Sequence, residues 1–158
     1  MDQKNAKTLI ERFGFKDDDL ATPEHDKILV WLLDEVNMMK VLSSFRTLLK
    51  KDMLYHIQEI KAESPILGYN NYNIGFIDVQ VKLLETDDKK TPMNTCYRSI
   101  CIEIKPKIKS IGELIRQINF YKSHRPHSDW IVVTKENGDA SVILWKQGIR
   151  MYQLPNGV

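Results

Sequence analysis

The stretch YRSICIEIKPKIKSIGELIRQINFYKSH, residues 97–124, predicts a strand, a short turn and an amphipathic helix in direct succession. In the strand, Ser99–Lys105, isoleucines that point into the core alternate with residues on the opposite face, among them Glu103 and Lys105. The helix begins at the capping-box pattern Ser110-Ile111-Gly112-Glu113 and repeats its apolar residues at helical spacing. This unit therefore places an acid and a base, one residue apart, beside a helix.

Two further pieces of sequence extend this unit. Gln117 and Tyr121 are four residues apart, so they lie about 40° apart on the flank of the helix's apolar stripe. Upstream, the alternating strand 74–84 directs Ile77 and two valines to one face and Asp78 to the other. If the two strands pair antiparallel, Asp78 and Glu103 converge on one face of the sheet, and the helix holds Gln117 and Tyr121 at its rim.

The remaining elements give an α/β protein with the chain order α-β-β-β-α-β-α-β. The first helix begins at Thr22-Pro23-Glu24, with a threonine cap and a proline in the first turn. The first strand follows Met53 and ends at Pro65 and Gly68. The later elements are the apolar strand 130–134, a helix at 139–147 and a last strand at 149–154. We expect one domain over residues 1–158, with a helical extension at 1–21, including a short helix at 3–13, and a core at 75–154.

Composition sets broad limits on the class of protein. Apolar residues make up 42% of the 158 residues and charged residues 28%, which is ordinary for a soluble globular domain. The longest apolar run, 28–33, is far shorter than the ~20 residues that cross a membrane, and no signal-peptide core is present. Two cysteines cannot form a tetrahedral cysteine site, so we expect a reducing, cytoplasmic setting and no membrane partner. The net charge of +2 neither requires nor excludes nucleic acid.

An aspartate on one strand and Glu-x-Lys on the next suit phosphodiester hydrolysis. Two carboxylates, Asp78 and Glu103, bind a hard cation such as Mg²⁺, which stabilises charge on phosphoryl oxygens and lowers the pKa of a bound water. The backbone carbonyl of Ile104 adds a ligand, so its side chain is free to join the core. Lys105 then orients the attacking water or neutralises developing charge.

The tripeptide alone is weak evidence, because the sequence holds a second copy, Glu59-Ile60-Lys61, and such pairs are usually on the surface. The copy at Glu103 is distinguished by the aspartate strand before it, the Gln–Tyr helix after it and the basic residues around it. Those basic residues are Lys105, Lys107, Lys109, Arg116, Lys122 and Arg125. We expect nucleic acid to contact Lys107, Lys109, Arg116, Gln117 and Tyr121.

With these motifs in place, the segment from Gly75 to Leu154 resembles the PD-(D/E)XK nuclease superfamily. Its Gln-x-x-x-Tyr helix resembles the branch that includes the RecB nuclease domain and lambda exonuclease. The resemblance implies a restriction-endonuclease-like fold, a mixed β-sheet flanked by helices. It also implies a Mg²⁺- or Mn²⁺-dependent deoxyribonuclease in which Asp78 and Glu103 are metal ligands and Lys105 is the catalytic lysine. Gln117 and Tyr121 would support the site and touch the DNA backbone.

The resemblance implies a further acid on the first helix, for which Glu24 is the best match; a plain first-turn helix acid is the alternative. Ile77 stands in place of the proline that gives the family its name. The sequence lacks a cysteine cluster, so we expect no iron–sulfur cluster. No helicase or specificity domain accompanies the segment, so processivity would need a homo-oligomer or a partner protein.

Three functions remain open at this point. The first is an exonuclease-like hydrolase of DNA. The second is a restriction-type endonuclease, which differs in substrate rather than in chemistry. The third is a non-catalytic module that binds nucleic acid or takes part in assembly.

Overall fold

The computed structural model of the protein describes residues 22–87 and 95–158. Its helices and strands are α2 (Pro23–Leu32), α3 (Glu35–Ser43), β1 (Met53–Leu67), the short 3₁₀ helix η1 (Tyr69–Asn71), β2 (Asn73–Asp87), β3 (Thr95–Ile104), α4 (Ile111–His124), β4 (Ser128–Thr134), α5 (Asp139–Lys146) and β5 (Ile149–Gln153). The predicted helix at 3–13 lies outside the described residues.

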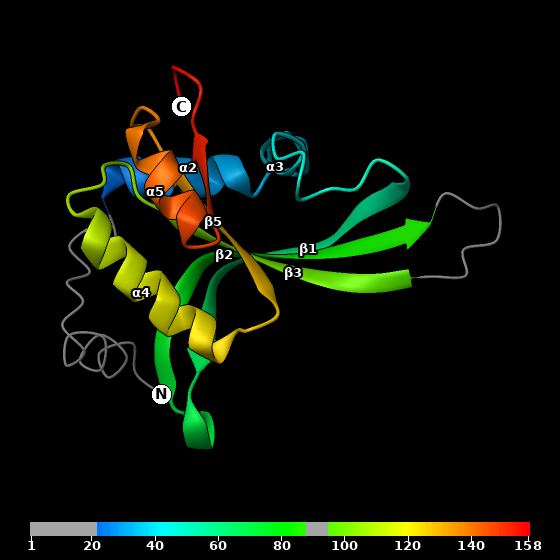
Figure 1. The fold of residues 1–158 in the computed structure, drawn as a ribbon, viewed down its shortest axis with the longest axis horizontal. Helices are drawn as coiled ribbons and strands as arrows, with labels where there is room; N and C mark the ends of the chain where they lie inside the picture. Colours follow the sequence, from blue (N-terminus) through cyan, green and yellow to red (C-terminus); the bar gives the residue numbers. More distant parts are fainter. Residues whose placement is uncertain (1–21, 88–94) are drawn as a thin grey trace.

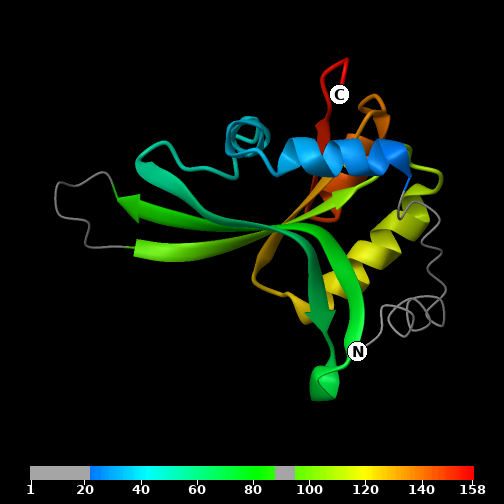
Figure 2. The ribbon, with the colours of Figure 1, turned by 180° about the vertical axis from the view of Figure 1, so that it is seen from behind.

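The strands form one mixed sheet in the order β1-β2-β3-β4-β5, flanked by helices (Figures 1 and 2). β1, β2 and β3 pair antiparallel, whereas β3, β4 and β5 pair parallel. The parallel connections run through α4 and α5, as parallel neighbours require a crossover. The prediction of an α/β protein with a mixed sheet flanked by helices is confirmed. No helix within residues 22–87 and 95–158 is long and apolar enough to span a bilayer.

The sheet separates two apolar clusters. On one face, α2 and α3 pack through Ile28 and Val41 against strand residues such as Ile102. On the other face, α4 and α5 pack through residues such as Ile118 against Trp130 and its neighbours. β4 contributes to both clusters, which explains its uninterrupted apolar sequence.

Local signals account for the helix boundaries. Thr22 accepts the His25 backbone N–H at the start of α2. Asp34 accepts the Asn37 N–H, so α3 begins as a separate helix rather than continuing α2. Ser110 accepts the Glu113 N–H at the start of α4, as the capping-box sequence predicts.

The prediction that Pro65 ends the first strand is wrong, because β1 continues to Leu67. β1 lies at the edge of the sheet and pairs only with β2. A proline is tolerated at an edge because its missing N–H removes no hydrogen bond to a second neighbour. Residues 85–96 are polar and predict a loop, but β2 extends to Asp87 and β3 begins at Thr95. Residues 88–94 lie outside the described residues.

The predicted common face of Ile77 and Val79 is also wrong. Val79 packs in the cluster under α2 and α3, whereas Ile77 packs in the cluster under α4. On the neighbouring strand Glu63 has a positive φ of 49°, between the pairs Ala62–Val79 and Ser64–Ile77. The end of the β1–β2 hairpin therefore turns from one helical layer to the other at Asp78, and simple alternation fails there.

A network of ion pairs around buried Glu85 ties four strands together near the end of the first apolar layer. Arg98 Nη2 lies 2.7 Å from Asp129 Oδ2, and Arg150 Nη1 lies 3.0 Å from Asp129 Oδ1. Arg98 Nη1 lies 3.4 Å from Glu85 Oε2, and Lys50 Nζ lies 3.1 Å from Glu85 Oε1. Burial alone would raise the pKa of Glu85, but Lys50, Tyr55 and Arg98 hold it below its ordinary value of 4.5.

A depressed carboxyl pKa in the folded state contributes stability that is present above the unfolded pKa and is lost as the pH falls through the folded pKa. We therefore expect Glu85→Gln to lower the free energy of unfolding by about 1–3 kcal/mol near neutral pH. The difference from wild type should shrink as the pH falls below 4.5. Urea denaturation across this range measures it, with Glu59→Gln, an exposed β1 glutamate, as the control. A difference that stays constant with pH would contradict the network.

Candidate active site

The site begins where the β2–β3 ladder ends. The last backbone pair of that ladder joins Val79 to Ile102. At the next position the Asp78 side chain replaces the backbone as the acceptor: its Oδ2 accepts the Ile104 N–H at 2.6 Å. Asp78 is buried, so this charge-assisted bond is shielded from water. It fixes the backbone between Glu103 and Lys105.

Glu103, near the end of β3, and Lys105, directly after the strand, contact each other. Lys105 Nζ is 3.3 Å from Glu103 Oε1, and the two side chains are 11% and 3% exposed. The Lys105 N–H donates to Val133 O at 2.9 Å, which holds the segment after β3 against β4. As predicted, the Ile104 side chain points into the core. Glu103 and Lys105, the acid and the base that the sequence places one residue apart, therefore form an ion pair with little exposure to solvent.

Helix α4 completes this contact from above the sheet. Gln117 Nε2 donates to Glu103 Oε1 at 3.1 Å and to Tyr121 Oη at 3.4 Å. The Tyr121 ring stacks on Trp130 with 6.1 Å between centroids. Gln117 and Tyr121 are both buried, with Gln117 in contact with Glu103 and Tyr121 in contact with Gln117. Their contact with DNA stays a prediction.

The Tyr121 ring is positioned by the absence of a side chain at Gly75 on β2. A Cβ at position 75 would lie 2.9 Å from Tyr121 Oη and 3.0 Å from Cε1. Only glycine allows the ring to approach this strand so closely. Gly75 and Trp130 thus confine the ring between a backbone and an indole.

His25, on α2, is the site residue that the sequence motifs do not identify. Its Nε2 lies 3.3 Å from Asp78 Oδ1 and its Nδ1 lies 3.5 Å from Asp26 Oδ1. These are ion-pair distances; within the described residues neither ring nitrogen has hydrogen-bond geometry. Asp78 above all, together with Asp26, raises the pKa of buried His25 above its ordinary value, against the lowering effect of burial.

A signal for His25 exists in the sequence. At 100° per residue, position 25 lies on the same stripe as Ile28 and Leu32, which are both buried. A histidine on a buried helical stripe requires a polar partner, and Asp78 is that partner.

The structure does not bring Glu24 into this chain of contacts. Its side chain is 64% exposed, and its Oε1 lies 3.5 Å from Lys135 Nζ. This placement favours the alternative of a plain first-turn helix acid, while a role in metal binding stays a prediction. The expected nucleic-acid contacts Lys107, Lys109 and Arg116 are all exposed at the surface, and their roles stay predictions as well.

Burial separates the two Glu-x-Lys copies. Glu59 and Lys61 are both exposed on the edge strand β1, whereas Glu103 is 2% exposed on the central strand β3. Transfer of a carboxylate from water into a protein interior is costly unless it is paired and hydrogen-bonded. Glu103 has both kinds of partner, Lys105 and Gln117, whereas Glu59 lies in solvent.

The donor types at the site suit a hard cation. Asp78 and Glu103 supply carboxylate oxygens from neighbouring strands, and Ile104 between the two anchored positions supplies a carbonyl. Over residues 22–87 and 95–158, no three or more His, Cys, Asp or Glu side chains are grouped as a metal centre. Metal binding stays a prediction that rests on the donor chemistry.

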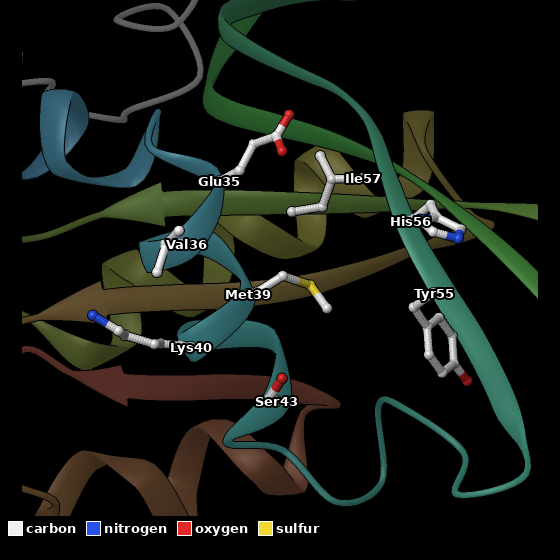
Figure 3. Close-up of a pocket in the computed structure, with 8 residues that line it drawn as sticks. All are labelled: Glu35, Val36, Met39, Lys40, Ser43, Tyr55, His56 and Ile57. Atoms are coloured by element: carbon white, nitrogen blue, oxygen red, sulfur yellow. The ribbon is translucent and has the colours of Figure 1, made fainter.

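A separate groove of about 550 Å³ lies between α3 and β1 (Figure 3). Val36, Met39 and Ile57 line it together with charged residues at its rim. None of the predicted site residues lines this groove. The groove is therefore separate from the predicted site at the β2–β3–α4 junction.

Comparisons with family models, with curated proteins and with solved structures found no match to the chain.

The close approach of Gly75 to Tyr121 can be tested through stability. We expect Gly75→Ala to lower the free energy of unfolding by about 1–3 kcal/mol, because the ring cannot retreat from Trp130. In a Tyr121→Phe background the cost should be smaller, since the nearest atom is gone. Gly112→Ala is the control: its Cβ meets nothing within 4 Å, so the helix should be unchanged or up to about 1 kcal/mol more stable. Equal effects of the two glycine substitutions in urea denaturation would rule out the packing described.

Proposed function

We propose that the protein is a metal-dependent deoxyribonuclease with a restriction-endonuclease-like fold. One observation carries the proposal: Asp78 fixes the backbone of the Glu103–Lys105 segment, and Gln117 of α4 holds the Glu103 carboxylate. Well-packed apolar residues would stabilise this junction as well or better. A buried set of two acids, a lysine and an amide is therefore explained best by chemistry.

Each side chain has a distinct task in this proposal. Asp78, Glu103 and the Ile104 carbonyl would hold Mg²⁺ or Mn²⁺, which when bound stabilises charge on the phosphate and lowers the pKa of water. His25 restrains the free rotation of the Asp78 carboxylate. Gln117 fixes Glu103, and Tyr121 fixes Gln117.

Lys105 is the residue that we assign to the reacting phosphate. Its ammonium group lies within 3.3 Å of Glu103 and keeps a small exposed fraction, so it is both held in place and reachable. A fixed cation at this position stabilises negative charge that develops on the phosphoryl oxygens more than it stabilises the ground state.

A module that binds DNA without cleaving it is the second candidate. The observation in its favour is that both Asp78 oxygens already have partners, Ile104 N–H and His25. In that case Glu103 and Lys105 would serve only stability, and no divalent metal would support cleavage.

Cleavage of labelled DNA with Mg²⁺, with Mn²⁺ and with EDTA distinguishes the two candidates. We expect activity only with metal, and a loss of about 10²–10³-fold in Lys105→Ala, the size of effect seen when one preorganised charge-stabilising group is removed. Glu103→Gln should be similarly impaired. Glu85→Gln, a second buried strand glutamate, and Lys146→Ala, an exposed lysine on α5, are the matched controls and should cleave like wild type below their melting temperatures.

Cleavage that persists in EDTA or in Lys105→Ala would refute the proposed mechanism. Absence of cleavage with every metal, combined with DNA binding that Glu103→Gln leaves intact, would establish the binding module instead.

The topology of the substrate tests the mode of attack. If the protein is an exonuclease, its attack begins at a DNA end. We then expect linear DNA to be degraded and covalently closed circular DNA to be spared. Gel electrophoresis of the two substrates, incubated with the same enzyme and metal, measures this. Linearisation of the circle would show a restriction-type endonuclease.

A further inference from the structure

A second polar site lies on the same face of the sheet as Glu103. It is a groove of about 470 Å³ between strands β1–β3 and the turn that follows α4. We call it the α4-end groove and define it by Lys61, Gln80, Lys82, Tyr97, Arg125 and His127. Alternation along β3 places Tyr97 and Glu103 on one face, six residues apart, or about 20 Å along the strand. Buried Cys101 lies between these two positions of β3, under α4, so the groove is a site separate from the candidate active site.

The walls of the groove are fixed by hydrogen bonds. Ser64 Oγ donates to Gln80 Oε1 at 2.5 Å, and Gln80 Nε2 donates to Ser99 Oγ at 3.2 Å, which forms a polar floor across three strands. Arg125 Nη2 donates to Pro65 O at 2.9 Å and joins the end of α4 to β1. The groove is therefore preorganised, and a ligand need not order it.

The charge of the groove favours an anion. Its lining includes Lys61, Lys82 and Arg125, against the single carboxylate of Glu59. Arg98 also borders it, but Glu85 and Asp129 neutralise that guanidinium. The groove therefore carries a local excess of positive charge, within a chain whose net charge is only +2. Spaced cations along a groove match the repeated phosphates of a nucleic-acid backbone.

An aromatic ring in the groove indicates which form of nucleic acid it takes. Tyr97 is 59% exposed, and Lys82 Nζ lies 4.4 Å from its ring centroid. An exposed ring beside phosphate-binding cations is a platform for an unstacked base. Bases inside a duplex are stacked on each other and cannot use such a platform, whereas those of a single strand can.

We propose that the α4-end groove binds a single DNA strand. Lys61, Lys82 and Arg125 contact its phosphates, and Tyr97 stacks on one of its bases. That this strand is also the substrate of the candidate active site rests on the proposed nuclease function, whereas single-strand binding by the groove does not.

Fluorescence anisotropy with a labelled single strand and the matching duplex, in EDTA so that nothing is cut, tests the groove. We expect the single strand to bind more tightly than the duplex. Tyr97→Ala should weaken single-strand binding about 5–150-fold, the range measured for loss of one stacked base. Lys82→Gln should reduce the slope of log affinity against log salt by about 0.7.

The chain offers a matched control in a second exposed aromatic residue with a cation over it. Trp145 on α5 is 54% exposed, and Arg150 Cζ lies 5.7 Å from its ring centroid, but it does not border the groove. Trp145→Leu and Lys146→Gln should bind like wild type. Tyr97→Phe keeps the ring and should also bind like wild type, which separates stacking from misfolding.

The outcomes separate this inference from the proposed function. If cleavage depends on metal and Lys105 but Tyr97→Ala and Lys82→Gln bind single-stranded DNA normally, the proposal for the groove is wrong and the proposed nuclease function is supported. If those variants lose single-strand binding while no metal supports cleavage, single-strand binding by the groove is supported and the proposed nuclease function is wrong. Absence of single-strand binding by wild type, or a preference for the duplex, would overturn the groove.

Discussion

The hydrogen bond from the Ile104 N–H to Asp78 Oδ2, at 2.6 Å, is the constraint on which the site depends. A buried backbone N–H requires an acceptor, and here β2 no longer supplies a carbonyl because its ladder with β3 has ended at Val79. The Asp78 side chain supplies the acceptor instead. The hairpin end of β1–β2 is then free to turn toward α4 while the backbone beside Glu103 stays fixed. The same turn carries Gly75 to the ring of Tyr121.

Two networks of charged side chains lie at different places on the sheet. On the face of α2 and α3, arginines at 98 and 150 both contact Asp129 and join neighbouring strands. Arginine is a rigid, always charged partner, suited to permanent ties. At the candidate site, the cationic partners are Lys105, a flexible ammonium beside Glu103, and His25 of α2, an imidazole beside Asp78. The first network joins strands of the sheet, whereas the second surrounds the two carboxylates of the candidate site.

The sequence predicts the parts of this protein whose environment is regular. Helix α4, with its cap, its apolar stripe and its Gln117–Tyr121 pair, depends on contacts within one helix and with one sheet face, so periodicity finds it. The apolar β4 is found for the same reason. The prediction that the first strand ends at Pro65 fails because the edge position of β1 is set by the order of strands in the sheet and not by the sequence of the strand itself. The predicted common face of Ile77 and Val79 fails because the β1–β2 hairpin turns from one helical layer to the other between them. His25 was missed because its partner, Asp78, is 53 residues away along the chain.

On the face of the sheet under α4, negative and positive charges lie apart along β3. Glu103 lies at one end of the helix-covered segment, the cationic groove lies at the other, and Cys101 lies between them, buried against Trp130. Burial raises the pKa of the Cys101 thiol to about 11, so it stays neutral near physiological pH. A thiolate there would place a second negative charge beside Glu103 and weaken the attraction of the groove for phosphate. Cys101 is two residues from Glu103 and four from Tyr97, so an uncharged thiol that α4 covers separates the carboxylate from the cationic groove on this face of β3.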